Sequence, residues 1–187
     1  KQVEQTGLLK GWVIERREGH LPAPPAGLNP ILSDLYVQHF QGRAKIEGIF
    51  FGEEADHPPA VPQIEVSREE LNNGRILDFS GRIRPELLLT YGVGKLGPDT
   101  LRQMPPRRWN IHAGLSPWYR GVITHFWPSY LLEPQMTGMT LHELTSDLDG
   151  GPVIHQTQAP LVKGDGIHEL ACRTVKAFGE ELLHLLR

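Results

Sequence analysis

The stretch WNIHAGLSPWYRG, residues 109–121, carries an amide and an imidazole two positions apart, directly before a bend with glycine and proline. A strand is predicted over residues 108–112, so that His112 ends it. Because residues i and i+2 of a strand point to the same face, Asn110 and His112 can act on one reacting group. Pro117 fixes one backbone angle of the bend and Gly121 permits an unusual one, so the bend can hold these groups rigidly.

A second stretch, SDLDGGPVI at residues 146–154, supplies a carboxylate. Asp149 stands on a glycine-rich turn, directly before an apolar run that is predicted to form a strand. Taken singly, an Asn-x-His pair or an Asp-Gly turn is common, and such side chains often hydrogen-bond the backbone. The two stretches together offer an amide, an imidazole and a carboxylate for chemistry on one group.

Predicted strands and helices alternate along most of the chain, which is typical of an α/β protein with a mostly parallel, doubly wound sheet. Two neighbouring strands near the C-terminus add an antiparallel edge pair. Strands are predicted over residues 12–15, 64–66, 86–91, 108–112, 139–144 and 152–159. Helices are predicted over residues 3–10, 31–51 (as one helix or a pair broken near Gly42), 67–73, 77–83, 98–104, 122–133 (interrupted or ended near Pro128) and 166–186, with loops at 19–30 and 53–62. Ligands in such sheets bind at the carboxyl ends of the strands, where His112 is expected.

The segment GVGKLG, residues 92–97, matches the G-x-G-x-x-G pattern of dinucleotide-binding proteins after a predicted strand. That pattern also requires an acidic residue about 20 positions further on, at the end of the next strand. The next strand here ends in Asn110-Ile111-His112, and no Asp or Glu occurs between Asp99 and Glu133. The sequence therefore disfavours a nicotinamide dinucleotide, and leaves a plain strand-to-helix turn or a loop for another ligand.

The two stretches together resemble the folate-dependent formyltransferase family, whose members move a formyl group from 10-formyltetrahydrofolate to an amine. The matching positions are Asn110, His112, residues 117–121 and residues 149–154, and the resemblance runs from about residue 87 to the C-terminus. It implies a Rossmann-like formyltransferase fold with Asn110, His112 and Asp149 as catalytic residues, and 10-formyltetrahydrofolate as the formyl donor.

The resemblance also assigns residues to the rest of the site. It implies that a backbone loop cradles the pterin of the folate, here Tyr91, Gly92, Val93, Gly94, Lys95 and Leu96. Thr140 and His142 match polar positions that line the site, although an ordinary half-buried strand pair would explain them equally well. Arg120 is expected near the site, where it can face an acidic substrate or, as we favour, pair with a neighbouring carboxylate.

Formyl transfer passes through a tetrahedral intermediate with a negative oxygen, and the three catalytic side chains suit its needs. An Asn N–H that donates to such an oxygen contributes about 100- to 1,000-fold in rate. A His that moves protons contributes about 100- to 10,000-fold. By the resemblance, Asp149 orients His112 and orders a water for proton relay. A hydrolase that releases formate from the same donor, and a non-catalytic folate- or ligand-binding relative, stay open as alternatives.

Composition limits the other classes of function. The 187 residues suit one domain, 1–187, and a net charge of −3 supports neither a nucleic-acid nor an anionic-membrane surface. The single Cys172 cannot form an internal disulfide, which favours a reducing, cytoplasmic setting and a core thiol. No H-x-x-x-H or C-x-x-C spacing occurs, so no metal is expected. We expect a small-molecule amine as acceptor, while its identity, the oligomeric state and the extent of any N-terminal trimming stay undetermined.

Overall fold

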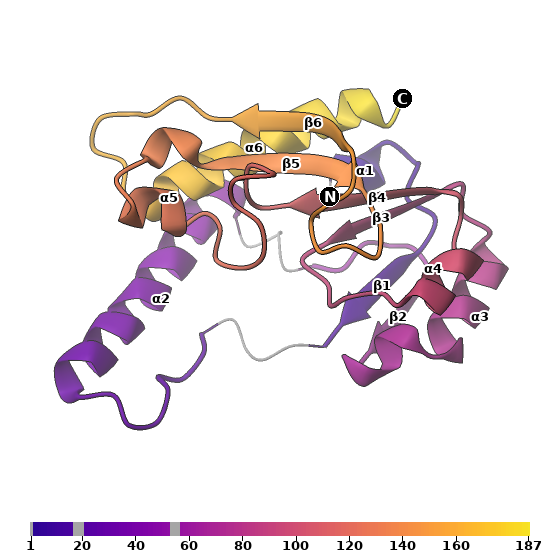
Figure 1. Ribbon diagram of the computed structural model, residues 1–187, viewed down its shortest axis with the longest axis horizontal. Coiled ribbons are helices and arrows are strands. Elements are labelled where there is room, and N and C mark those ends of the chain that lie inside the picture. Colours follow the sequence, from indigo (N-terminus) through magenta and orange to yellow (C-terminus); the bar gives the residue numbers. More distant parts are fainter. Residues whose placement is uncertain (1, 17–20, 53–56) are drawn as a thin grey trace.

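The computed structural model describes residues 2–16, 21–52 and 57–187, and it is an α/β protein, as predicted (Figure 1). The strands are β1 Trp12–Glu15, β2 Gln63–Val66, β3 Leu87–Tyr91, β4 Arg107–His112, β5 Gly138–Glu143 and β6 Val153–Gln158. The helices are α1 Gln2–Gln5, α2 Pro30–Phe51, η2 Glu69–Asn72, α3 Gly74–Ile83, α4 Pro98–Gln103, α5 Trp127–Tyr130, η3 Pro134–Met136 and α6 Ile167–Leu185. Parts of the predicted loops at 19–30 and 53–62 lie outside the described residues.

The strands form two sheets. β1 pairs with β2 in parallel, and the second sheet has the order β3-β4-β5-β6. β3 and β4 are parallel, whereas β4 with β5 and β5 with β6 are antiparallel. The predicted antiparallel pair near the C-terminus is confirmed as β5 and β6. The division into two sheets was not predicted from the sequence.

Strand register in the four-stranded sheet positions the site. On one side of β4, Asn110 is aligned with Thr90 of β3. On the other side, Asn110 is aligned with His142 and His112 with Thr140, both of β5. Polar residues from three strands therefore meet around the last residues of β4.

Two apolar clusters hold this sheet in place. In one, Phe178 and Leu182 of α6 pack against Trp109, Met139 and Leu141 of β4 and β5. The other joins β2, η2, α3 and α4 through Val66, Leu71, Ile76, Leu96, Leu101 and Met104. Each large apolar side chain buried in this way stabilises the fold by about 1.5–3 kcal/mol, so the strand ends rest on a rigid support.

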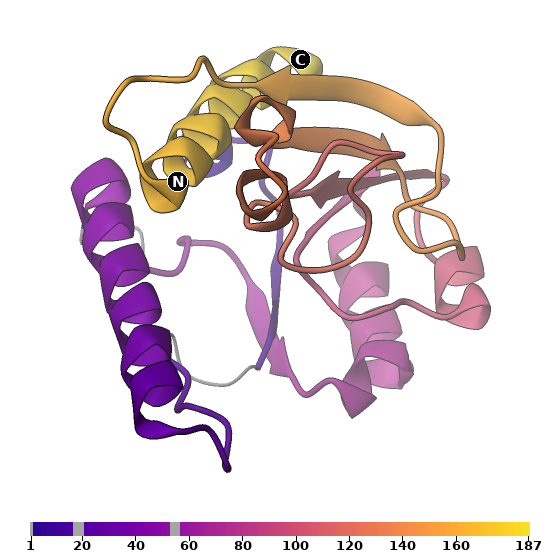
Figure 2. The same cartoon turned by 60° about the vertical axis from the view of Figure 1, so that its left-hand side comes forward.

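Helix α2 is continuous through Gly42, so of the two predicted arrangements the single helix is confirmed. Asn29 caps it by accepting a hydrogen bond from the Leu32 N–H at 2.9 Å. Gly42 lies against α6, because a Cβ there would be 3.6 Å from the His168 ring. The helix has no buried residue and stands away from the sheets (Figures 1 and 2). Within the described ranges, no helix has both the length and the apolar content needed to cross a membrane.

The predicted helix at 122–133 is wrong. The segment forms turns and the four-residue helix α5, and Pro128 is the second residue of α5 rather than its end. Ile123 has a φ of +60°, a left-handed conformation that interrupts a helix. Val122 and Ile123 are exposed, so the apolar spacing that suggested a helix does not correspond to a buried face.

Candidate active site

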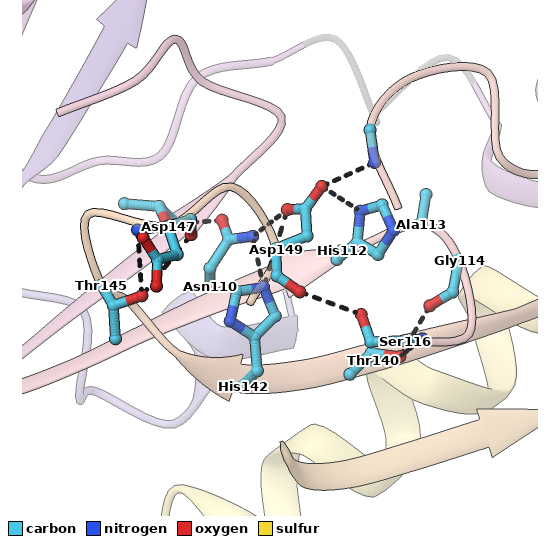
Figure 3. A network of polar contacts seen from close by, with 12 residues as sticks. Asn110, His112, Ala113, Gly114, Ser116, Thr140, His142, Thr145, Asp147 and Asp149 are labelled. Carbon is cyan, nitrogen blue, oxygen red and sulfur yellow. Dashed lines mark hydrogen bonds and ion pairs between the residues drawn. The ribbon is translucent and has the colours of Figure 1, made fainter. Parts of the chain in front are cut away.

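The end of β4 and the turn before β6 bring the predicted amide, imidazole and carboxylate together (Figure 3). Nδ1 of His112 lies 3.5 Å from Oδ2 of Asp149. Nδ2 of Asn110 lies 3.5 Å from Oδ1 of the same carboxylate. The carboxylate therefore spans the two β4 side chains, with one oxygen directed to each.

A second imidazole, from the fully buried His142, joins this cluster. Its Nε2 lies 3.1 Å from Nδ2 of Asn110 and 3.7 Å from Oδ1 of Asp149. Its Nδ1 lies 2.8 Å from the carbonyl oxygen of Glu143. Because a carbonyl can only accept, Nδ1 donates there, and Nε2 faces both the Asn110 amide and the Asp149 carboxylate.

Thr90 sets the orientation of the Asn110 amide. The Thr90 hydroxyl is buried and donates to Oδ1 of Asn110 at 2.7 Å. Both N–H bonds of Asn110 are then directed to His142 and Asp149. The contact to Asp149 is at the upper limit for a hydrogen bond and is the weaker of the two. This N–H is accordingly the one that can turn to a substrate oxygen.

The bend after β4 holds His112 and Asp149 at the same time. Nε2 of His112 donates to the carbonyl oxygen of Tyr119 at 2.7 Å, which leaves Nδ1 facing the carboxylate. The Gly121 N–H donates to Oδ2 of Asp149 at 2.8 Å. The bend includes a cis peptide bond between Ser116 and Pro117.

Thr140 fixes this bend to the sheet. Its hydroxyl donates to the carbonyl oxygen of Gly114 at 2.6 Å and accepts from the Ser116 N–H at 3.1 Å. Gln156 of β6 donates to the carbonyl oxygen of Ser116 at 2.7 Å. Thr140 was expected to line the site, but it is fully buried beneath the bend and acts on the backbone.

Two glycines permit the close approach of these segments. A Cβ on Gly114 would lie 2.5 Å from the Tyr119 carbonyl oxygen and 2.6 Å from Nε2 of His112. A Cβ on Gly151 would lie 1.9 Å from the Glu143 carbonyl oxygen. Asp149 itself has a φ of +46°, a left-handed conformation that Asp tolerates better than most residues.

The Asp149 carboxylate is held in its charged form. Burial alone would raise its pKa, but the adjacent His142 ring, the Gly121 N–H and the neighbouring His112 ring outweigh burial and lower the pKa below its ordinary value. Asp149 therefore stays ionised at neutral pH and can orient a neighbouring imidazole.

The predicted pterin loop begins beside this cluster, because Tyr91 is aligned with Ile111 at the ends of β3 and β4. Tyr91 and Gly92 are exposed, and Gly92 has a φ of +60°. The second half of the loop is engaged within the protein. The Gly94 N–H donates to Glu15 at 2.8 Å, the Lys95 carbonyl accepts from Asn72 at 3.0 Å, and the Leu96 side chain is in the core. Three groups of the predicted loop are therefore engaged within the protein, with the Glu15 carboxylate accepting from the Gly94 N–H, and pterin binding by residues 91–96 stays a prediction.

In the part of the chain that the structure describes, no group of three or more His, Cys, Asp or Glu side chains could hold a metal ion. The burial of Cys172 raises the pKa of its thiol to about 11, so the thiol is neutral and unreactive at neutral pH.

Comparison with known proteins identifies the family. A model described as formyl transferase matches residues 41–185. The chain belongs to the formyl transferase family. The match begins well before residue 87, where the sequence resemblance was first visible, and it includes the second half of α2 as well as β2.

Relatives of the chain are known in sequence and in structure. A methionyl-tRNA formyltransferase of Koribacter versatilis (strain Ellin345) is 32% identical over 113 residues, or 60% of this chain and 36% of that protein. One of Pelobacter propionicus is 32% identical over 134 residues, or 67% of this chain and 41% of that protein. The chain thus spans well under half the length of these two curated relatives.

Solved structures of formyltransferases share the fold. A phosphoribosylglycinamide formyltransferase from Bacillus halodurans superposes with a TM-score of 0.62 at 16% identity, covering 97% of this chain and 81% of that one. Glycinamide ribonucleotide transformylase 1 from Geobacillus kaustophilus gives 0.54 at 27% identity, covering 64% and 66%. The expected Rossmann-like formyltransferase fold is therefore confirmed.

Several residues of this candidate site could not be identified from the sequence. Thr90 reaches Asn110 through strand register, and Gln156 reaches the bend from β6. The Tyr119 carbonyl and the Gly121 N–H act through the backbone, which any residue supplies. A hydrophobic or alternating pattern cannot identify such contacts.

Proposed function

We propose that this chain is the catalytic domain of an enzyme that transfers a formyl group from 10-formyltetrahydrofolate to the amine of a small molecule. The observation that carries the proposal is the convergence of Asn110 and His112 on the Asp149 carboxylate, in a member of the formyl transferase family. These groups match what acyl transfer between two nitrogens requires, namely an oxyanion donor, a proton carrier and a group that orients the carrier.

The chemistry balances with these residues and no covalent enzyme intermediate. The acceptor nitrogen forms a bond to the formyl carbon, and the formyl oxygen becomes negative. The Asn110 N–H that points weakly at Asp149 turns to this oxygen. Nδ1 of His112, which is unprotonated while Nε2–H donates to the Tyr119 carbonyl oxygen, takes the proton from the attacking amine and passes it to the leaving nitrogen of the folate. The negative oxygen re-forms the carbonyl as the bond between that nitrogen and the formyl carbon breaks. Asp149 keeps the ring in place and balances its transient positive charge.

The donor is proposed to lie against the exposed start of the loop, residues 91–93. Tyr91 presents an exposed ring, and the backbone of Gly92 and Val93 is adjacent to the end of β4. A pterin is flat and rich in hydrogen-bonding groups, which suits a ring and open backbone at a strand end. Gly94, Lys95 and Leu96 fit this role less well, because their groups are already engaged within the chain.

A small-molecule acceptor is supported by the charge of the chain. The relatives named above act, by their names, on methionyl-tRNA or on phosphoribosylglycinamide. A tRNA requires a basic surface, whereas this chain has a net charge of −3. The proposed setting is the reducing cytoplasm, in keeping with one buried, unpaired cysteine.

The test is turnover of 10-formyltetrahydrofolate by the purified chain with a panel of primary amines. Loss of the formyl donor is followed by absorbance, the formylated amine by mass spectrometry and free formate by a coupled assay. His112→Ala should lower the rate by about 100- to 10,000-fold. His184→Ala, at the exposed end of α6, is the matched control and should keep the wild-type rate.

The products of this assay distinguish a transferase, a hydrolase and a non-catalytic relative. A formylated amine that depends on His112 supports the transferase. Formate released at the same rate with and without any amine supports the hydrolase alternative. A wild-type chain that binds the folate but turns over none of it is a non-catalytic relative, and the proposal then fails.

A further inference from the structure

Arg120 lies between two backbone groups of the bend that contact the proposed catalytic side chains. The residue before it, Tyr119, accepts the hydrogen bond from His112, and the residue after it, Gly121, donates to Asp149. The backbone of Arg120 is therefore fixed between two contacts to the proposed catalytic groups. Its side chain is exposed.

The guanidinium of Arg120 has no hydrogen bond, ion pair or ring contact to any residue that the structure describes, unlike most arginines in the described ranges. Eight other described arginines have such a partner, which is a carboxylate for Arg16, Arg43, Arg75, Arg102 and Arg173, a carbonyl for Arg108, and an aromatic ring for Arg82 and Arg107. The sequence favoured a neighbouring carboxylate as the partner of Arg120, and the structure does not place one within 4.0 Å in the described ranges.

The guanidinium nevertheless lies beside the proposed reacting groups. One of its terminal nitrogens is 3.8 Å from the position that a Cβ on Gly150 would take, so the cation lies over the turn that carries Asp149. Both oxygens of the Asp149 carboxylate have partners other than Arg120, namely Asn110, His112 and the Gly121 N–H. The cation thus lies close to the proposed reacting groups, and its donors have no partner among the described residues.

Resting on the formyl transfer proposed above, we infer that Arg120 binds an anionic group, a carboxylate or a phosphate, carried by the acceptor amine. A guanidinium presents five donors in a planar fork that matches both anions in a bidentate manner. An acceptor held in this way would have its anion over the Asp149–Gly150 turn and its amine directed to the imidazole of His112. Arg120 would then select acceptors and leave the chemical step to the other side chains.

Turnover with matched amines tests the selection. Glycine is compared with glycinamide, and O-phosphoethanolamine with ethanolamine, in the wild type and in Arg120→Gln. The variant should lose about 10- to 100-fold in kcat/KM for the anionic member of a pair, the range of a charge-assisted hydrogen bond, and little for the neutral one. The pair with the larger loss distinguishes a carboxylate from a phosphate. An equal loss on charged and neutral amines, or none, would overturn the inference.

A binding measurement separates this inference from the proposed function, because it needs no turnover. Inorganic phosphate and acetate are titrated separately into 15N-labelled protein while the Gly121 amide signal is followed by NMR. The signal should shift in the wild type and in Arg102→Gln, whose side chain lies on the exposed face of α4. It should stay still in Arg120→Gln.

The Asp147→Asn variant tests whether Arg120 has only a structural role. Asp147 is the candidate partner for such a role, because its Cβ lies 3.1 Å from the position that a Cβ on Gly150 would take. If Arg120 served only to pair with Asp147 in solution, both variants would lower the melting temperature equally and neither anion would move the Gly121 signal, which would overturn the inference. If no amine is formylated while phosphate or acetate binding depends on Arg120, the formyl transfer fails and the anion site stands.

Discussion

Gly114→Ala should inactivate the enzyme by displacing His112, and the structure gives the size of the effect. The new Cβ would lie 2.5 Å from the Tyr119 carbonyl oxygen and 2.6 Å from Nε2 of His112, whereas ordinary contact begins at 3.4 Å. Either atom must move by close to 1 Å, so the hydrogen bond that orients the imidazole breaks. A misplacement of about 1 Å costs on the order of 100-fold in rate, and overpacking costs about 1–3 kcal/mol of stability.

The measurement is kcat/KM for formyl transfer, with the free energy of unfolding from urea titration on the same samples. Gly81→Ala is the matched control, because Gly81 lies within α3 and nothing is within 4 Å of its Cβ position. Alanine should stabilise that helix by about 0.5–1 kcal/mol without changing turnover. A folded Gly114→Ala protein with the wild-type rate would refute the reasoning, since His112 would then act without its contact to the bend.

Three further changes probe the same framework. Thr90→Val removes the donor to the Asn110 amide oxygen, so kcat should fall about 10-fold, as steady-state kinetics will measure, with the protein still folded. Gly151→Ala places a Cβ 1.9 Å from the Glu143 carbonyl oxygen, so the turn must open and the melting temperature should fall together with activity. Burial, with a smaller effect from nearby positive charge, lowers the pKa of His125 to about 4 from 6.5, so the folded protein excludes a proton that the unfolded chain binds between these values. Above pH 6.5 the ring is neutral in both the folded and the unfolded state. As the pH falls from 6.5 toward 4, the unfolded state gains the proton first, and the free energy of unfolding decreases by about 3 kcal/mol in total. His125→Gln should remove this part of the acid sensitivity in urea unfolding at pH 4.5 and 7, and an unchanged pH slope would contradict it.

Local patterns were sufficient to predict most elements of the fold. Strand β1 occupies residues 12–15 as predicted, and the helix predicted at 67–73 is present as the short η2, before which Glu70 accepts from the Ser67 N–H at 2.8 Å. The i, i+2 spacing predicted that Asn110 and His112 share one face of the strand, and both side chains face the Asp149 carboxylate, because this spacing depends on strand geometry alone. Such features depend on a few neighbouring residues, and tertiary contacts seldom override them.

The features that the sequence did not reveal depend on distant contacts or on backbone angles. Ile123 adopts a positive φ that its residue type disfavours, so no propensity argument could have ended the predicted helix there. Gly42 does not break α2, because α6 packs against it. Thr90 becomes part of the site through the register of β3 and β4, and register is set by the whole sheet.

Asn110, His112 and Asp149 are proposed to act as one unit, and a double-mutant cycle on His112 and Asp149 measures this most directly. Initial rates of formyl transfer from 10-formyltetrahydrofolate are compared for the wild type, His112→Ala, Asp149→Asn and the double variant. Asn tolerates the left-handed backbone at position 149, so the exchange removes the charge and keeps the turn. If the two residues cooperate, the double variant loses no more than about the larger single loss. Losses that multiply, or an Asp149→Asn protein as fast as the wild type, would contradict the account.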